Sequence, residues 1–262
     1  HRTAHQLGIP TNATMLFGHI ETNADIVDHL SQLRSLQDET GGFRAFIPLP
    51  FHSGGTRIGV QRGPSEDRIA RVTALARIFL DNVQHIRVLV NYVDRKLLAV
   101  LTHGGVDDIG GTSVKERIAK AAGASDKHRF IMPEEMNSFI VSLRLVPVLT
   151  NSAYAGMTPA NEKKRHSSGP DVLSAAASGR IASQDAIWLH DSAPLGRLGE
   201  IAMLRRRQLV PGNNVTFVMD RNLSVTNVCE TKCKFCAFHA TPESEKEFTL
   251  SANYGLSVPV CL

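Results

Sequence analysis

The chain has 262 residues, of which 42% are hydrophobic and 21% charged, an ordinary composition for a globular protein. Its net charge of +4 and pI of ≈ 9.0 are mildly basic, too little by themselves to indicate nucleic-acid binding. No apolar run reaches the ~18 residues that a membrane-spanning helix needs. We therefore expect neither a nucleic-acid nor a membrane partner.

Residues 1–150 alternate between strand-like and helix-like segments, judged by the spacing of their apolar residues. The predicted strands are 13–17, 45–49, 86–90 and 106–109. The predicted helices are 25–39, 65–80, 96–103, 114–122 and 133–143. Thr22 and Asp25 have the spacing of a capping box at the start of the first helix. Four successive strand–helix units predict an α/β fold with a parallel sheet.

The composition becomes polar after this segment, and we interpret residues 151–171 as a linker. Helices are predicted over 172–178, 184–190 and 197–207, with Ser183 as the cap of the second. A strand over 215–219 then leads directly into a loop with three cysteines, and only 248–251 continues beyond it. The predicted organisation is thus 1–150, the linker 151–171, and 172–262 with a helical cap, one strand and the cysteine loop.

Polar residues recur where the predicted strands of the first segment end. They are His19, Glu21, His52, Asp107 and Asp108. The carboxyl ends of the strands carry the chemistry of βα barrels, whereas any single polar residue there can also be a solvated loop residue or a helix cap. We take His19 and Glu21 as the candidates for contacts with a substrate or cofactor.

Cys229, Cys233 and Cys236 have the spacing C-x3-C-x2-C, the most informative motif in the chain. Three close thiolates suit three irons of a 4Fe–4S cluster and leave the fourth iron open to a small molecule. The remaining cysteine, Cys261, lies far along the chain. A structural zinc site remains an alternative, because His239 could complete a Cys3His set. Disulfides are a third reading, disfavoured by the few cysteines.

The cysteine motif resembles the signature of radical SAM enzymes, which bind S-adenosylmethionine (SAM) at the open iron. The run 215–238, with Asp220-Arg-Asn222 before the cysteines, is similar to the start of the barrel in dehypoxanthine futalosine cyclase, and the helices before it resemble that family's N-terminal cap. By this resemblance Phe235 packs near the bound cofactor.

The first segment resembles the same superfamily, but its C-terminal half. The runs 13–22, 36–43, 46–51, 80–83 and 107–112 are similar to aminofutalosine synthase. The order is therefore inverted, and the resemblance implies incomplete radical SAM (TIM-like) barrel pieces. We interpret the chain as the join of two fused enzymes, with a circularly permuted enzyme as the rival. About three of the eight strands of a barrel are unaccounted for, so we expect poor turnover.

The family resemblance implies a radical SAM enzyme of menaquinone biosynthesis by the futalosine route, with a 4Fe–4S cluster and SAM as cofactors. SAM would be cleaved to a 5′-deoxyadenosyl radical that acts on a small-molecule pathway intermediate. A flavodoxin or ferredoxin would supply the electron. The alternatives are a deazaflavin (coenzyme F420 precursor) synthase-type radical SAM protein and a non-catalytic zinc module. Free thiols and the lack of a targeting segment predict a cytoplasmic protein.

Overall fold

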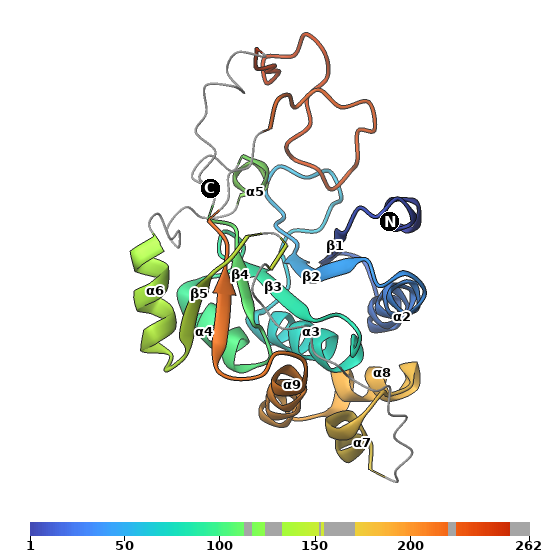
Figure 1. Cartoon of the computed structure of the whole chain (residues 1–262). Helices are drawn as coiled ribbons and strands as arrows, with labels where there is room; N and C mark the ends of the chain where they lie inside the picture. The colour runs from blue at the N-terminus through green and yellow to red at the C-terminus, as the bar shows by residue number, and fades with distance from the viewer. Residues whose placement is uncertain (113–116, 124–132, 152, 155–170, 220–223, 252–262) are drawn as a thin grey trace.

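The computed structural model describes residues 1–112, 117–123, 133–151, 153–154, 171–219 and 224–251 (Figure 1). Its strands form one six-stranded sheet in the order β1-β2-β3-β4-β6-β5. They are β1 (Thr11–Phe17), β2 (Phe43–Pro50), β3 (His85–Leu89), β4 (Asp108–Gly110), β5 (Val146–Leu149) and β6 (Asn214–Phe217). All five pairings between these strands are parallel. The predicted α/β fold with a parallel, partial TIM-like sheet is confirmed.

Nine helices occur in the described part of the chain. They are α1 (Arg2–Gln6), α2 (Asn23–Thr40), α3 (Glu66–Phe79), α4 (Arg95–His103), α5 (Ile118–Ala121), α6 (Pro133–Ser142), α7 (Val172–Ser178), α8 (Ser183–Ser192) and α9 (Leu195–Leu209). The capping box at α2 is confirmed, because the Thr22 hydroxyl accepts from the Asp25 N–H at 3.2 Å and the Asp25 carboxylate accepts from the Thr22 N–H at 2.8 Å. None of the helices described is long and apolar enough to cross a bilayer.

Two sequence predictions about individual elements are wrong. Ser183 is the first residue of α8 and not its cap, since the N-cap is Ala182 and no side chain caps the helix. No strand was predicted from the sequence at β5 either, in which Pro147 lacks the N–H that an interior strand needs. Proline is tolerated here since β5 lies at an edge of the sheet, paired only with β6.

Helix α3 joins the two parts of the chain into one hydrophobic core. Ten of its fourteen residues are buried, and it contacts α4 on one side and α7, α8 and α9 on another. The core includes Phe17 and Leu75 from the first segment and Leu198 and Phe217 from the second. Figure 1 shows α7, α8 and α9 together at the amino ends of the strands, away from the cysteine loop. The helical cap therefore supports the sheet from the end opposite the site.

Strand β6 lies between β4 and β5, although β5 precedes it in sequence by the whole of the helical cap. The Thr216 N–H donates to the Asp107 carbonyl at 2.9 Å, and the Val218 N–H donates to the Ile109 carbonyl at 3.1 Å. We call this β4–β6 contact the seam. Because every strand runs the same way, the seam places the cysteine loop at the carboxyl edge of the strands of the first segment (Figure 1).

Asp107 and Asp108 do not lie at a carboxyl end, as expected from the sequence, but at the amino end of β4. Both carboxylates are fully buried. Asp107 pairs with Arg77 and with His85, whose Nδ1 lies 2.5 Å away, and accepts from the Ile86 N–H. Asp108 pairs with Arg87 and accepts from the Tyr154 and Thr216 hydroxyls at 2.5 and 2.8 Å. Both aspartates are therefore part of the scaffold.

Candidate functional site

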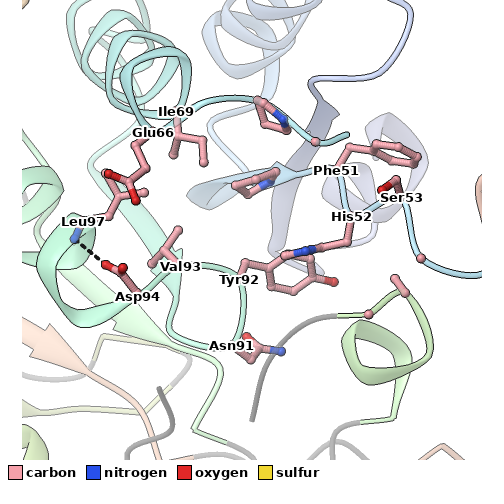
Figure 2. Close-up of a pocket in the computed structure, with 16 residues that line it drawn as sticks. Phe51, His52, Ser53, Glu66, Ile69, Asn91, Tyr92, Val93, Asp94 and Leu97 are labelled. Carbon is pink, nitrogen blue, oxygen red and sulfur yellow. Dashed lines mark hydrogen bonds between the residues drawn. The ribbon is translucent and has the colours of Figure 1, made fainter. Parts of the chain in front are cut away.

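A cavity of about 420 Å³ opens at the carboxyl ends of β2 and β3. The walls are formed by the loop after β2, the first turns of α3 and α4, the loop after β3, and Ala122 and Gly123 (Figure 2). Polar side chains from three of these elements line it, namely His52, Ser53, Glu66, Asn91, Tyr92 and Asp94. The Asp94 carboxylate caps α4 by accepting from the Leu97 N–H at 2.7 Å. The position matches that of an active site in a βα barrel.

His52 is the titratable ring in this cavity, and its centroid lies 5.3 Å from that of Tyr92 (Figure 2). Burial lowers the pKa of His52, and a hydrogen bond to the Tyr92 backbone only partly offsets that effect. The ring is therefore neutral at pH 7. Its Nε2 is buried and has no hydrogen-bond partner among the described residues. His52 thus offers a hydrogen-bonding atom that a bound molecule could satisfy.

His19 and Glu21 lie together in the turn after β1. Their side chains hydrogen-bond mainly to backbone groups of this turn. Glu21 accepts from the Gly18 and His19 N–H groups at 2.6 and 2.9 Å and from Arg68 at 3.1 Å. Burial opposes ionisation of Glu21, but these hydrogen bonds outweigh it and hold its pKa below the ordinary value. The carboxylate therefore organises the turn.

The His19 ring is oriented by two contacts. Its Nδ1 accepts the Ile20 N–H at 2.7 Å, and the ring packs edge-on against Phe51 with the centroids 5.7 Å apart. Since Nδ1 is already an acceptor, its 3.2 Å approach to Glu21 is not a hydrogen bond. Phe51 also lines the cavity, so His19 is adjacent to the cavity wall. A direct role for either residue in binding stays a prediction.

Cys229, Cys233 and Cys236 are free thiols, partly exposed, on a loop with neither helix nor regular strand. Hydrogen bonds from the Thr231 backbone and hydroxyl and from the Lys232 backbone hold the pKa of Cys229 below its ordinary value. Among the described residues no three His, Cys, Asp or Glu side chains converge as a metal site. The donor set suits an iron–sulfur cluster, while binding one requires the loop to draw its three sulfur atoms together.

Three further residues were singled out from the sequence, namely Phe235, His239 and Cys261. Phe235 is 48% exposed, so its predicted packing against a cofactor stays a prediction. His239 donates through Nδ1 to the Cys236 carbonyl at 2.9 Å, which ties the ring to the third cysteine. Cys261, the cysteine expected not to be a ligand, lies outside the described residues.

Arg57 connects the cavity wall to the cysteine loop, and sequence reasoning missed it. Its backbone N–H donates to the Lys234 carbonyl and its Nη2 to the Lys232 carbonyl, each at 2.8 Å. Gly55 approaches so closely that a Cβ there would lie 3.2 Å from the Cβ of Ala237. The loop between β2 and α3 thus contacts both the cavity and the cysteine loop. The only sequence signal was its Gly/Ser/Arg composition, which marks a loop but not what the loop meets.

Comparison with known proteins finds similarity over the first part of the chain. Residues 40–162 match the family described as the CofH/MqnC C-terminal region. An aminodeoxyfutalosine synthase of Thermus thermophilus is 42% identical over 158 residues, 59% of this chain and 42% of the relative. A 5-amino-6-(D-ribitylamino)uracil--L-tyrosine 4-hydroxyphenyl transferase of Methanopyrus kandleri is 37% identical over 161 residues, 58% of this chain and 42% of that protein.

A transferase of the same name from Methanosphaerula palustris is 43% identical over 139 residues, 52% of this chain and 38% of its own length. The chain thus spans about two fifths of the length of the curated relatives it matches. The predicted resemblance to the radical SAM family of the futalosine pathway is confirmed. The cyclase-like assignment of 172–262 and the boundaries at 150 and 171 remain predictions, and the matched region extends to 162.

Proposed function

We propose, from the match of residues 40–162 to the CofH/MqnC C-terminal region, that this chain is a radical SAM enzyme, or part of one, in the futalosine route to menaquinone. The similarity to an aminodeoxyfutalosine synthase supports a reaction of that type on a small-molecule intermediate. A one-electron donor such as flavodoxin or ferredoxin would be its redox partner. The protein would work in the cytoplasm.

The observation that carries this proposal is the double contact of the loop between β2 and α3. His52, Ser53 and Gly54 line the cavity, and Arg57 a few residues later hydrogen-bonds to the cysteine loop. A radical enzyme must hold its substrate beside the group that generates the radical. One short loop that contacts both the cavity and the cysteine loop meets that requirement.

Cys229, Cys233 and Cys236 would hold a 4Fe–4S cluster and SAM would bind at its open position. When bound, these cofactors supply the one-electron cleavage that starts the reaction. Phe235 would cover the bound SAM, and His52 would donate to or accept from the substrate as a neutral ring. Glu21 would hold the turn that places His19 beside the Phe51 wall.

Anaerobic reconstitution with iron and sulfide tests the ligand assignment. We expect absorption at roughly 400 nm, as iron–thiolate clusters show, but only slow release of 5′-deoxyadenosine from SAM under dithionite, in line with the poor turnover expected from the sequence. Cys233→Ala should abolish the absorption and Cys261→Ala should leave it unchanged. The proposal fails if the protein takes up zinc but not iron and sulfide, or if Cys261 proves as necessary as Cys233.

A second candidate function is a deazaflavin-type reaction, favoured by the match to 4-hydroxyphenyl transferases at 37–43% identity. The names of those relatives specify tyrosine and a ribitylaminouracil as reactants. Reconstituted protein incubated with SAM and either these two compounds or the futalosine-pathway substrate would decide. Consumption of tyrosine with the uracil would favour the second candidate over the first.

A further inference from the structure

Arg57 brackets the central cysteine of the loop with two hydrogen bonds. The Lys232 carbonyl, immediately before Cys233, accepts from Arg57 Nη2, and the Lys234 carbonyl, immediately after it, accepts from the Arg57 N–H. Both donor–acceptor distances are 2.8 Å. Lys232 itself has a φ of 50°, a left-handed conformation uncommon for a residue with a side chain. The guanidinium therefore binds the loop at the point where its backbone turns.

The same guanidinium also faces His239, and the contacts of this ring define its tautomer. Nδ1 lies 2.9 Å from the Cys236 carbonyl, which can only accept, so Nδ1 carries the proton. Nε2 lies 3.4 Å from Arg57 Nη2, which can only donate, so Nε2 is the acceptor. Both ring nitrogens are thus hydrogen-bonded, and the lone pair of the unprotonated Nε2 is directed at the Arg57 guanidinium.

This arrangement bears on which metal the loop accepts. A histidine binds zinc through an unprotonated ring nitrogen, and Cys3His is a common closed zinc set. Because the Nε2 lone pair of His239 accepts from Arg57, it is not available to bind zinc in a Cys3His site. The three cysteines alone remain, and three protein ligands are what an iron–sulfur cluster with an open iron requires.

We infer that Arg57 is a positioning residue that determines which metal the loop binds, an inference that rests on the proposed function. Arg57 orients the loop around Cys233 and keeps His239 from becoming a fourth ligand. Iron–sulfur assembly with an exchangeable position is thereby favoured over a closed Cys3His zinc site. The residue acts through the backbone carbonyls and His239 and does not itself touch metal or substrate.

The test uses Co²⁺ as a spectroscopic probe on the metal-free chain, comparing Arg57→Ala with Arg62→Ala, an exposed arginine in the same loop. In Arg57→Ala we expect Co²⁺ affinity to rise on the order of tenfold, the scale of outer-shell effects on metal sites. The visible d–d bands should shift to those of three thiolates and one imidazole. Adding His239→Ala should reverse both changes, and Arg57→Lys should retain much of the wild-type behaviour.

A second readout follows the loop without any metal. Iodoacetamide should alkylate Cys233 several-fold faster in Arg57→Ala than in Arg62→Ala, because the side-chain hydrogen bond to the Lys232 carbonyl is lost and the turn opens more often, although the backbone bond to Lys234 is kept. Equal Co²⁺ spectra, affinities and alkylation rates for the two variants would overturn the role of Arg57. Failure of the wild-type chain to assemble a cluster would count against the proposed function instead, since the Co²⁺ and alkylation comparisons do not depend on it.

Discussion

The seam between β4 and β6 is stabilised by buried polar contacts, whereas the cysteine loop that follows it is partly exposed. At the seam, Asp107, Asp108 and Thr216 are fully buried, and each of their side-chain oxygens has a hydrogen-bond partner. In the loop the cysteines are partly exposed, and the backbone is secured by two isolated bridges, Thr226 to Thr249 and Val228 to Ala240. The scaffold is thus fixed by desolvated contacts, whereas the loop can still adjust.

This difference has a physical reason in what each region must do. A buried charge left without its partner costs several kcal/mol, so the seam has few alternative arrangements. Exposed backbone hydrogen bonds compete with water, so the loop can move at small cost. Under the proposed function, the loop would need that freedom to draw three thiols around a cluster, while the rigid seam holds the start of the loop at the carboxyl edge of the sheet.

Asp107→Asn at the seam should cause the largest loss in the free energy of unfolding. The change leaves Arg77 buried beside a neutral side chain, although burial already lowers the pKa of Arg77 to about 10. Removing one partner of a buried pair costs roughly 3–5 kcal/mol. Urea unfolding at pH 7 should show a loss of this order. A loss no larger than that of an exposed control, Asp67→Asn on α3, would mean that the seam is not held by its charges.

The same pair predicts how stability depends on pH. Burial alone would raise the pKa of Asp107, but Arg77, His85 and the Ile86 N–H outweigh it and hold that pKa below the ordinary value. The stabilisation is therefore complete above the unfolded pKa of about 3.9 and is lost as pH falls through the lower folded pKa. Unfolding midpoints measured through that acid range should fall less steeply for Asp107→Asn than for the wild type.

Thr216→Val should have an intermediate effect, because it removes one donor to Asp108 while keeping the shape of the side chain. The Asp108 carboxylate still has Arg87 and the Tyr154 hydroxyl. A buried acceptor that loses a partner costs about 1–3 kcal/mol. Thr14→Val on the exposed face of β1 is the matched control. Hydrogen exchange should accelerate at β4 and β6 in the first variant only.

Asn227→Ala in the cysteine loop should have the smallest effect on global stability. The Asn227 side chain donates to the Lys246 carbonyl at 2.8 Å and accepts from the Phe248 N–H at 2.9 Å, so it holds the two ends of the loop together. We expect faster exchange at Phe248 and a change of less than ~1 kcal/mol in the free energy of unfolding. A large global loss would show that the loop is part of the cooperative core.

Local patterns in the sequence were enough for much of the fold. The apolar periodicity located helices close to their observed bounds, and for α7 the predicted and observed ranges coincide at Val172–Ser178. The capping box of Thr22 and Asp25 was predictable because both partners lie within one helical turn. The three-cysteine spacing is local in the same sense, and it indicated metal chemistry without any structure.

The remaining features depend on residues far apart in sequence, and only the tertiary structure decided them. The strand β5, with Pro147 in it, is recognised only from its place at a sheet edge, where the missing N–H is not needed. From the sequence, Asp107 and Asp108 were placed at the carboxyl end of a strand, whereas the structure buries them at the amino end of β4 with charged partners from α3 and β3. Arg57 meets Lys232, Lys234 and His239 only because the parallel seam brings the two carboxyl-end loops together. Periodicity and spacing are local properties of a chain, whereas strand order and desolvated pairing arise only when distant segments pack.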